Sequence, residues 1–134
     1  MKPAPFSTHI LDRKLAQQRQ QWERDRQALL LVAKTWLEQH AHQFGIEQGY
    51  LFGSVTQANK FSAHSDVDIA IETFKHGDPF GLVGYLSLHI DREVDIVPLD
   101  QCHFVEKIRR IGIEWNTKRK SSDVRTPEKG GEPT

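Results

Sequence analysis

The sequence predicts an α/β domain, with a sheet flanked by helices and a long helix at the N-terminus. Residues 10–44 contain neither Gly nor Pro and are rich in good helix formers, which favours one long helix, broken at most once. Residues 67–72 alternate apolar and polar side chains, and residues 93–98 are rich in β-branched side chains, so both segments read as strands. Between them, Asp78 and Pro79 indicate a helix start, because Asp caps a helix N-terminus and Pro fits its first turn.

The long helix is expected to end near Gly45, a residue type that often follows a helix C-terminus. Its apolar residues recur at spacings of three, four and seven and therefore form one stripe. The stripe consists of Leu11, Leu15, Trp22, Leu29, Ala33, Trp36 and Leu37. The denser C-terminal half is expected to pack on the core. The thinner half, residues 11–22, is expected to reach toward a partner or a second copy of the chain, and fraying or folding back on the core is the alternative.

The remaining elements follow from short local signals. Residues 49–52 form an apolar run that ends at Gly53, which predicts a strand and a tight turn, followed by a short helix from Ser54 to Lys60. The helix that starts at Pro79 is expected to reach residue 90. Residues 104–111 predict a last helix.

Length and composition set the organisation of the chain. With 134 residues, the chain has room for one hydrophobic core. We expect a helical extension over residues 1–44, a core over residues 45–117, and a disordered tail over residues 118–134, where charged residues, Gly and Pro leave little to bury. Eighteen basic residues balance eighteen acidic ones, so a basic nucleic-acid surface is not implied. Cys102 is the single cysteine and no apolar segment could span a bilayer, which favours a cytoplasmic protein without a membrane partner.

Three carboxylates are the strongest chemical signal in the sequence. Asp66 and Asp68 are two residues apart at the start of a strand, so their side chains project from the same face. Asp95 lies within the later strand, which we expect to be central, and its apolar neighbours point to the opposite face. If the two strands are adjacent, the three acids meet, and their mutual repulsion favours a divalent metal. Magnesium is the natural choice, because it binds a few carboxylates together with phosphate oxygens and water.

The turn at Gly53 and Ser54 supplies the second half of a nucleotide site. Gly53 permits a close approach of the backbone to a ligand. The helix expected to start at Ser54 would direct its free N–H groups and positive dipole end toward phosphate. Taken separately, a turn and two exposed carboxylates are common features of any surface. Their combination in this order is what indicates a site.

This combination resembles the signature of the minimal nucleotidyltransferase family, within the DNA polymerase β-like superfamily. The signature is Gly-Ser, about ten residues, Asp-x-Asp and a further Asp on a later strand. Here it reads Gly53-Ser54, eleven residues, Asp66-x-Asp68 and then Asp95. The resemblance implies the small nucleotidyltransferase (polymerase β-like) fold, a mixed sheet flanked by helices. It also implies ATP bound at Gly53 and Ser54, and Mg²⁺ held by Asp66, Asp68 and Asp95 as the catalytic residues.

The resemblance covers roughly residues 44–115 and has two departures. The spacer is one residue longer than expected, and residues 57–60 read Gln-Ala-Asn-Lys where many members carry a small residue, Arg and Gly. Lys60 is the candidate for the missing positive charge.

Small members of this family resemble the antitoxin of a pair whose toxin is a HEPN-domain ribonuclease. The resemblance implies transfer of AMP from ATP to a tyrosine of that toxin, which silences it, in a complex with the toxin or as a homo-oligomer. Two alternatives remain open. One is an antitoxin that neutralises the toxin by binding alone, and the other is a nucleotidyltransferase for a small hydroxylated molecule.

Overall fold

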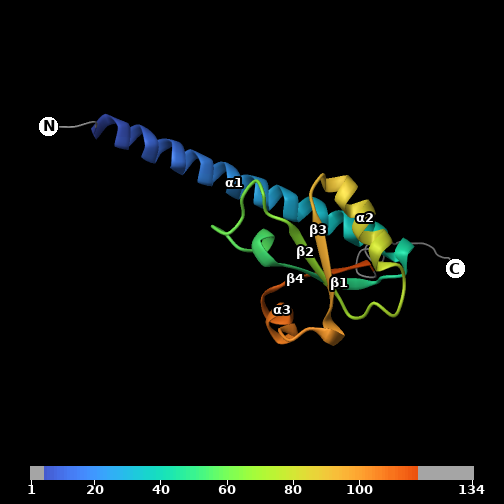
Figure 1. The fold of residues 1–134 in the computed structure, drawn as a ribbon. Helices are drawn as coiled ribbons and strands as arrows, with labels where there is room; N and C mark the ends of the chain where they lie inside the picture. The colour runs from blue at the N-terminus through green and yellow to red at the C-terminus, as the bar shows by residue number, and fades with distance from the viewer. Residues whose placement is uncertain (1–4, 118–134) are drawn as a thin grey trace, which may run out of the picture.

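The chain forms a four-stranded mixed sheet with helices on both faces (Figure 1), in a computed structural model that describes residues 5–117, with side chains from residue 9 onward. The strands are β1 (Gln48–Phe52), β2 (Val67–Ile71), β3 (Val94–Pro98) and β4 (Ile113–Asn116). They lie in the order β3-β2-β1-β4. β1 is antiparallel to β2 and β4, whereas β2 and β3 are parallel. The predicted α/β class is therefore confirmed, and β3 lies at the edge of the sheet rather than at its centre.

The long N-terminal helix, α1 (Pro5–His40), continues into a 3-10 turn, η1 (Ala41–Phe44). Gly45 ends it in the left-handed region, with φ of 76°. Ala33 and Leu37 are fully buried against the sheet, so the C-terminal half of the apolar stripe packs as predicted. The N-terminal half extends beyond the sheet (Figure 1).

α2 (Pro79–Ile90) connects the two parallel strands and begins where the sequence predicts. The Asp78 carboxylate accepts a hydrogen bond from the Gly81 amide at 3.0 Å, which is the expected N-cap. α1 and α2 cover one face of the sheet and build the main core with its strands.

Within residues 5–117, the elements that pack on the other face cover only half of it. The 3-10 turn η3 (Leu99–Gln101) and the helix α3 (Val105–Ile111) follow β3 and pack over this face. They form a second, smaller core on Ala70, with Leu99 and Ile108 at its centre. The half of this face near the start of β2 and the end of β1 carries the polar residues considered below.

The segment after Gly53 differs from its prediction. Instead of a helix from Ser54 to Lys60, the structure has a single 3-10 turn, η2 (Gly53–Thr56). The Thr56 hydroxyl donates to the Gly53 carbonyl at 2.8 Å, and Gln57 is extended, so the turn cannot continue as a helix. Without an α-helix here, the helix dipole expected at Ser54 is absent.

β4 is the element that the sequence analysis did not predict. It pairs with β1 and places Trp115 in the core with no exposed surface. Its four residues alternate apolar and polar side chains, which is a strand pattern of minimal length, and the sequence analysis missed it. The expected disordered tail, residues 118–134, lies outside the described residues. Over the described part of the chain, no helix is both long enough and apolar enough to cross a membrane.

Candidate nucleotide and metal site

The register of the sheet aligns Phe52, Asp68 and Asp95 in one row. Asp68 is the partner of Phe52 across the β1–β2 pair and of Asp95 across the β2–β3 pair. Partners in register project from the same face, and adjacent strands lie about 4.8 Å apart. The prediction that Asp68 and Asp95 share a face of the sheet is confirmed.

This row lies on the half of the face that α3 leaves open. The next row toward the other end of the strands is Tyr50, Ala70 and Val97, and it is covered by η3 and α3. Asp68 is half-buried, whereas Asp95 is exposed because β3 is an edge strand. The expectation of a central strand around Asp95 is wrong, because the order of strands depends on pairings between distant segments.

Asp68 has the most perturbed carboxyl group of the site. Burial first, and then the negative charges of Asp95 and Asp66, together raise the pKa of Asp68 to about 6. Asp66 is therefore close enough to act on Asp68 electrostatically, although it lies in the exposed segment before β2. The three predicted carboxylates thus share one electrostatic environment, with Asp68 at its centre.

Gly53 directly follows Phe52 and lies against the carboxylate of Asp68. Its φ of 79° is in the left-handed region, and a Cβ atom at this position would collide with the Asp68 carboxylate. The turn is also fixed from α1, because the Arg26 guanidinium donates to the Val55 carbonyl at 3.1 Å. The close approach of backbone to ligand predicted at Gly53 is, in this structure, an approach of backbone to a carboxylate of the site.

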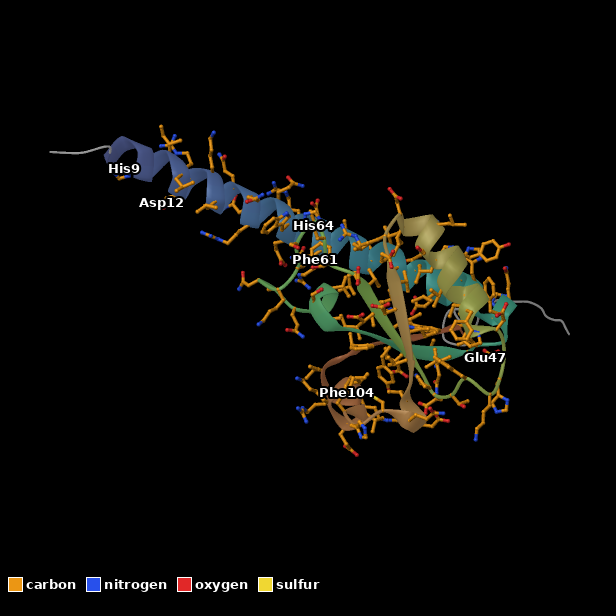
Figure 2. All side chains as sticks on the ribbon, in the orientation of Figure 1. His9, Asp12, Glu47, Phe61, His64 and Phe104 are labelled. Carbon is orange, nitrogen blue, oxygen red and sulfur yellow. The ribbon has the colours of Figure 1, made fainter. Side chains whose placement is uncertain are left out.

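A cleft of about 370 Å³ opens beside this turn. Its lining is Phe52, Gly53, Gln57, Phe104, Lys107, Ile108 and Ile111. The rings of Phe52 and Phe104 lie 6.3 Å apart, and Lys107 adds one exposed cation. Figure 2 shows Phe104 on the side of the sheet away from α1. An apolar cleft with few polar groups is the usual form of a small-molecule site.

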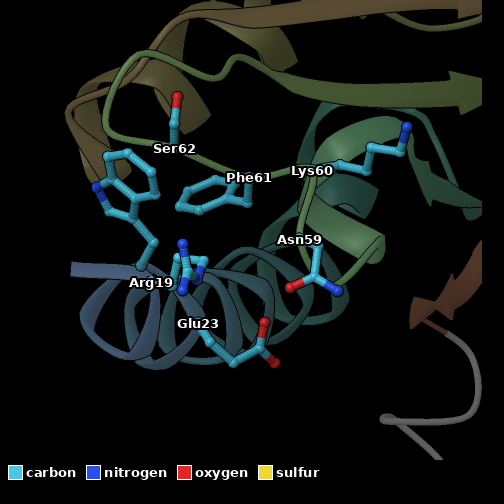
Figure 3. A pocket seen from close by; sticks show the side chains of 7 residues that line it. Arg19, Glu23, Asn59, Lys60, Phe61 and Ser62 are labelled. Carbon is cyan, nitrogen blue, oxygen red and sulfur yellow. The ribbon is translucent and has the colours of Figure 1, made fainter. Parts of the chain in front are cut away.

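A second hollow, of about 200 Å³, lies between α1 and the loop before β2 (Figure 3). Arg19 and Lys60 contribute cations to it, and Trp22 and Phe61 contribute aromatic rings. Lys60, the candidate for the missing positive charge, therefore lines this hollow rather than the cleft beside Gly53. The chain turns here because Asn59 adopts a positive φ of 72°.

No known family model, curated protein or solved structure matches the chain. The resemblance to minimal nucleotidyltransferases thus depends on the motif residues of the sequence. The sequence analysis missed Phe104, Lys107 and Ile111, which line the cleft. The sequence gives no signal that separates them from other residues of a short helix. In the structure, Phe104 and Ile111 are marked as apolar side chains that remain 48% and 45% exposed.

Magnesium can be tested against the residues present. Among the described residues, no group of three or more His, Cys, Asp or Glu side chains is arranged to hold a metal ion by itself. Magnesium nevertheless fits, because it is commonly bound by one or two carboxylates together with substrate phosphates. Asp68 and Asp95 supply two adjacent carboxylates, and a cation would relieve the repulsion that raises the pKa of Asp68.

Proposed function

We propose that this chain is an ATP-dependent nucleotidyltransferase whose acceptor is a tyrosine of a HEPN-domain ribonuclease toxin, so that transfer of AMP neutralises the toxin. The observation that carries the proposal is the row formed by Asp68 and Asp95 in direct register, with Gly53 against Asp68. The order of these residues along the chain supports the same reading.

In this proposal, Asp68 and Asp95, with Asp66 beside them, hold Mg²⁺. When bound, the ion offsets negative charge on the triphosphate and on the leaving pyrophosphate. Asp95 is exposed at the sheet edge, and in this proposal it accepts the proton of the tyrosine hydroxyl. The hydroxyl oxygen forms a bond to the α-phosphorus, the bond to pyrophosphate breaks, and the proton passes through Asp95 to solvent.

The cleft beside Gly53 is the proposed position of the nucleoside. Phe52 and Phe104 offer aromatic faces to a planar base, and Lys107 offers a cation to the phosphates. The acceptor approaches from the other end of the row, where β3 ends the sheet and Asp95 meets solvent. This open end supports a large acceptor such as a folded protein over a small molecule that needs an enclosing pocket.

Transfer of label from α-labelled ATP to the co-expressed toxin tests the proposal. We compare the wild type, the double variant Asp66→Asn with Asp68→Asn, and the matched control Asp100→Asn, an exposed carboxylate on η3. The double variant should lose transfer by at least about 100-fold, since a single electrostatic group is commonly worth about 10²–10³ in rate. Equal labelling by the wild type and the double variant would contradict the proposal. Silencing of the toxin without labelling would favour an antitoxin that acts by binding alone.

A further inference from the structure

Arg92 joins the turn after α2 to the loop that precedes β2. Its Nη1 atom lies 2.8 Å from the carbonyl oxygen of Ser65, 3.3 Å from that of Ser62 and 3.4 Å from that of Ala63. Its guanidinium carbon lies 4.8 Å from the centre of the Phe61 ring. One side chain therefore contacts four of the five residues before Asp66. Charge-assisted hydrogen bonds and stacking on an aromatic ring are among the stronger contacts that a partly exposed Arg can make.

Arg92 is itself held by its surroundings. Its amide donates to the Ser87 carbonyl at 3.3 Å, and its carbonyl accepts from the Ser87 hydroxyl at 2.7 Å. The preceding residue, Asp91, ends α2 in the left-handed region, with φ of 55°. The next residue, Glu93, accepts from the Val67 amide at 3.0 Å. Arg92 thus contacts the loop before Asp66, and Glu93 contacts Val67 directly after it. Both contacts hold the segment around Asp66 against the start of β3.

The loop has few other anchors. Ser62 and Ser65 hydrogen-bond each other through the Ser62 amide and the Ser65 hydroxyl, at 2.9 Å, and Ala63 and His64 are exposed. Among the described residues, Arg92 supplies the only side-chain hydrogen bonds that reach residues 61–66 from outside this segment. Phe61 lies against α1, and Figure 2 shows Phe61 and His64 of this loop away from Phe104. Removal of the guanidinium would leave the loop joined to the fold mainly through Phe61 and the start of β2.

We propose that Arg92 is a positioning residue that holds residues 61–66 so that Asp66 stays beside Asp68, and that it thereby sets the affinity of the site for a divalent cation. This inference rests on the proposed function, because it takes Asp66 as a ligand. Lysine cannot replace the contact fully, since a single ammonium group cannot both reach several carbonyls and stack flat on Phe61. Residues that support metal ligands in this way commonly change metal affinity or activity by about 10–100-fold when removed.

The test compares wild type, Arg92→Ala and Arg92→Lys, with Arg24→Ala as the matched control. Arg24 is exposed on α1 and hydrogen-bonds only Gln21 among the described residues. Amide hydrogen exchange over residues 61–66 reports on the loop without any need for activity. Binding of Mn²⁺, measured by water proton relaxation, and the Mg²⁺ concentration that gives half-maximal transfer report on the site.

Arg92→Ala should speed exchange of the loop amides and weaken Mn²⁺ binding by about 10-fold or more, with Arg92→Lys between it and wild type. The Mg²⁺ requirement for transfer should rise in the same order, while Arg24→Ala stays at wild-type values. Folded Arg92→Ala, or folded Arg92→Lys where the Ala variant does not fold, with wild-type Mn²⁺ affinity would overturn the role of Arg92. A wild-type chain that neither binds Mn²⁺ nor transfers AMP would overturn the proposed function instead.

Discussion

Gly53 lies against the carboxylate of Asp68, and this contact is possible because Gly53 has no side chain. The left-handed backbone at Gly53 ends β1, and the space that its Cβ would occupy is taken by the Asp68 carboxylate. The same glycine therefore adopts the left-handed backbone without strain and leaves room for the charged carboxylate of Asp68. Substitution at this position should affect both the stability and the chemistry of the site.

We predict that Gly53→Ala destabilises the fold by about 1–3 kcal/mol, because a left-handed conformation is unfavourable with a Cβ. It should also displace Asp68 and lower nucleotidyl transfer. Gly84→Ala is the matched control, because Gly84 lies in the middle of α2 with open space around it. There, added helix propensity should stabilise the fold by about 0.5–1 kcal/mol. Urea unfolding of both variants measures the effects, and equal stabilities would contradict the account of Gly53.

The raised pKa of Asp68 predicts a pH dependence of stability in metal-free buffer. Its folded-state pKa of about 6 exceeds the ordinary value of 3.8, so the folded chain binds this proton more tightly. The resulting stabilisation is complete below about pH 4 and is lost as the pH rises through about 6. Asp68→Asn removes the ionised group and should raise the free energy of unfolding at pH 8 by about 1 kcal/mol, after allowance for solvent screening.

The measurement is the difference in unfolding free energy between Asp68→Asn and wild type from pH 4 to pH 8, with chelator present. This difference should grow with pH and level off above about 7. Asp100→Asn, at an exposed carboxylate, should show no such trend. A difference that is constant over this range would show that Asp68 titrates normally in the folded chain.

Local signals in the sequence were sufficient for much of the fold. The start of α2 could be predicted because Asp78 and Pro79 act within one helical turn. β2 could be predicted because alternate burial of Val67 and Ile69 requires an alternating pattern. β4 was missed, because its alternating pattern is only four residues long and its strand partner, β1, lies more than sixty residues earlier in the chain.

The candidate site was likewise predictable only where it depends on local signals in the sequence. Strand alternation, with the assumption that the two strands are adjacent, predicted the shared face of Asp68 and Asp95, because this depends on local geometry and one pairing. The edge position of Asp95, the lining of the cleft by Phe104 and the loop contacts of Arg92 depend on which distant segments meet. No periodicity within a single segment records such contacts.

The exposed half of α1 predicts an association surface. Leu11 is 57% exposed and Leu15 is 41% exposed, on the stripe that continues into the core at Ala33. We expect Leu11→Ser with Leu15→Ser, or deletion of residues 1–20, to weaken binding to a helical toxin or to a second copy by about 10-fold or more, because a few apolar anchors dominate such contacts. The melting temperature should change little, since these side chains contact solvent.

Leu31→Ser is the control for this surface, because Leu31 is 66% exposed on the same helix but lies outside the stripe. Co-purification with the toxin and analytical ultracentrifugation of the chain alone measure the association. If the double variant and the deletion both associate as tightly as wild type, α1 has no role at the interface.

Trp115 predicts different costs for two substitutions in the core. It is fully buried, and its indole N–H has no hydrogen-bond partner among the described residues. Trp115→Ala should cost about 3–5 kcal/mol through lost burial and a cavity. Trp115→Phe should cost less than half as much, because it removes a buried donor whose isolation costs about 1–3 kcal/mol. Thermal unfolding of the two variants checks this, and similar costs would contradict it.

The edge position of β3 also affects the behaviour of the chain in concentrated solution. An exposed edge strand can pair with the edge of another molecule, and charged residues and Pro on the strand oppose such pairing. β3 carries Asp95 as its second residue and Pro98 as its last, and its other three residues are Val or Ile, which favour strand pairing. The charge of Asp95 would then also oppose aggregation. Its replacement by Asn or Ala would leave an edge rich in Val and Ile without this charge. Variants made at Asp95 to test the proposed catalysis should accordingly be less soluble than those made at Asp66.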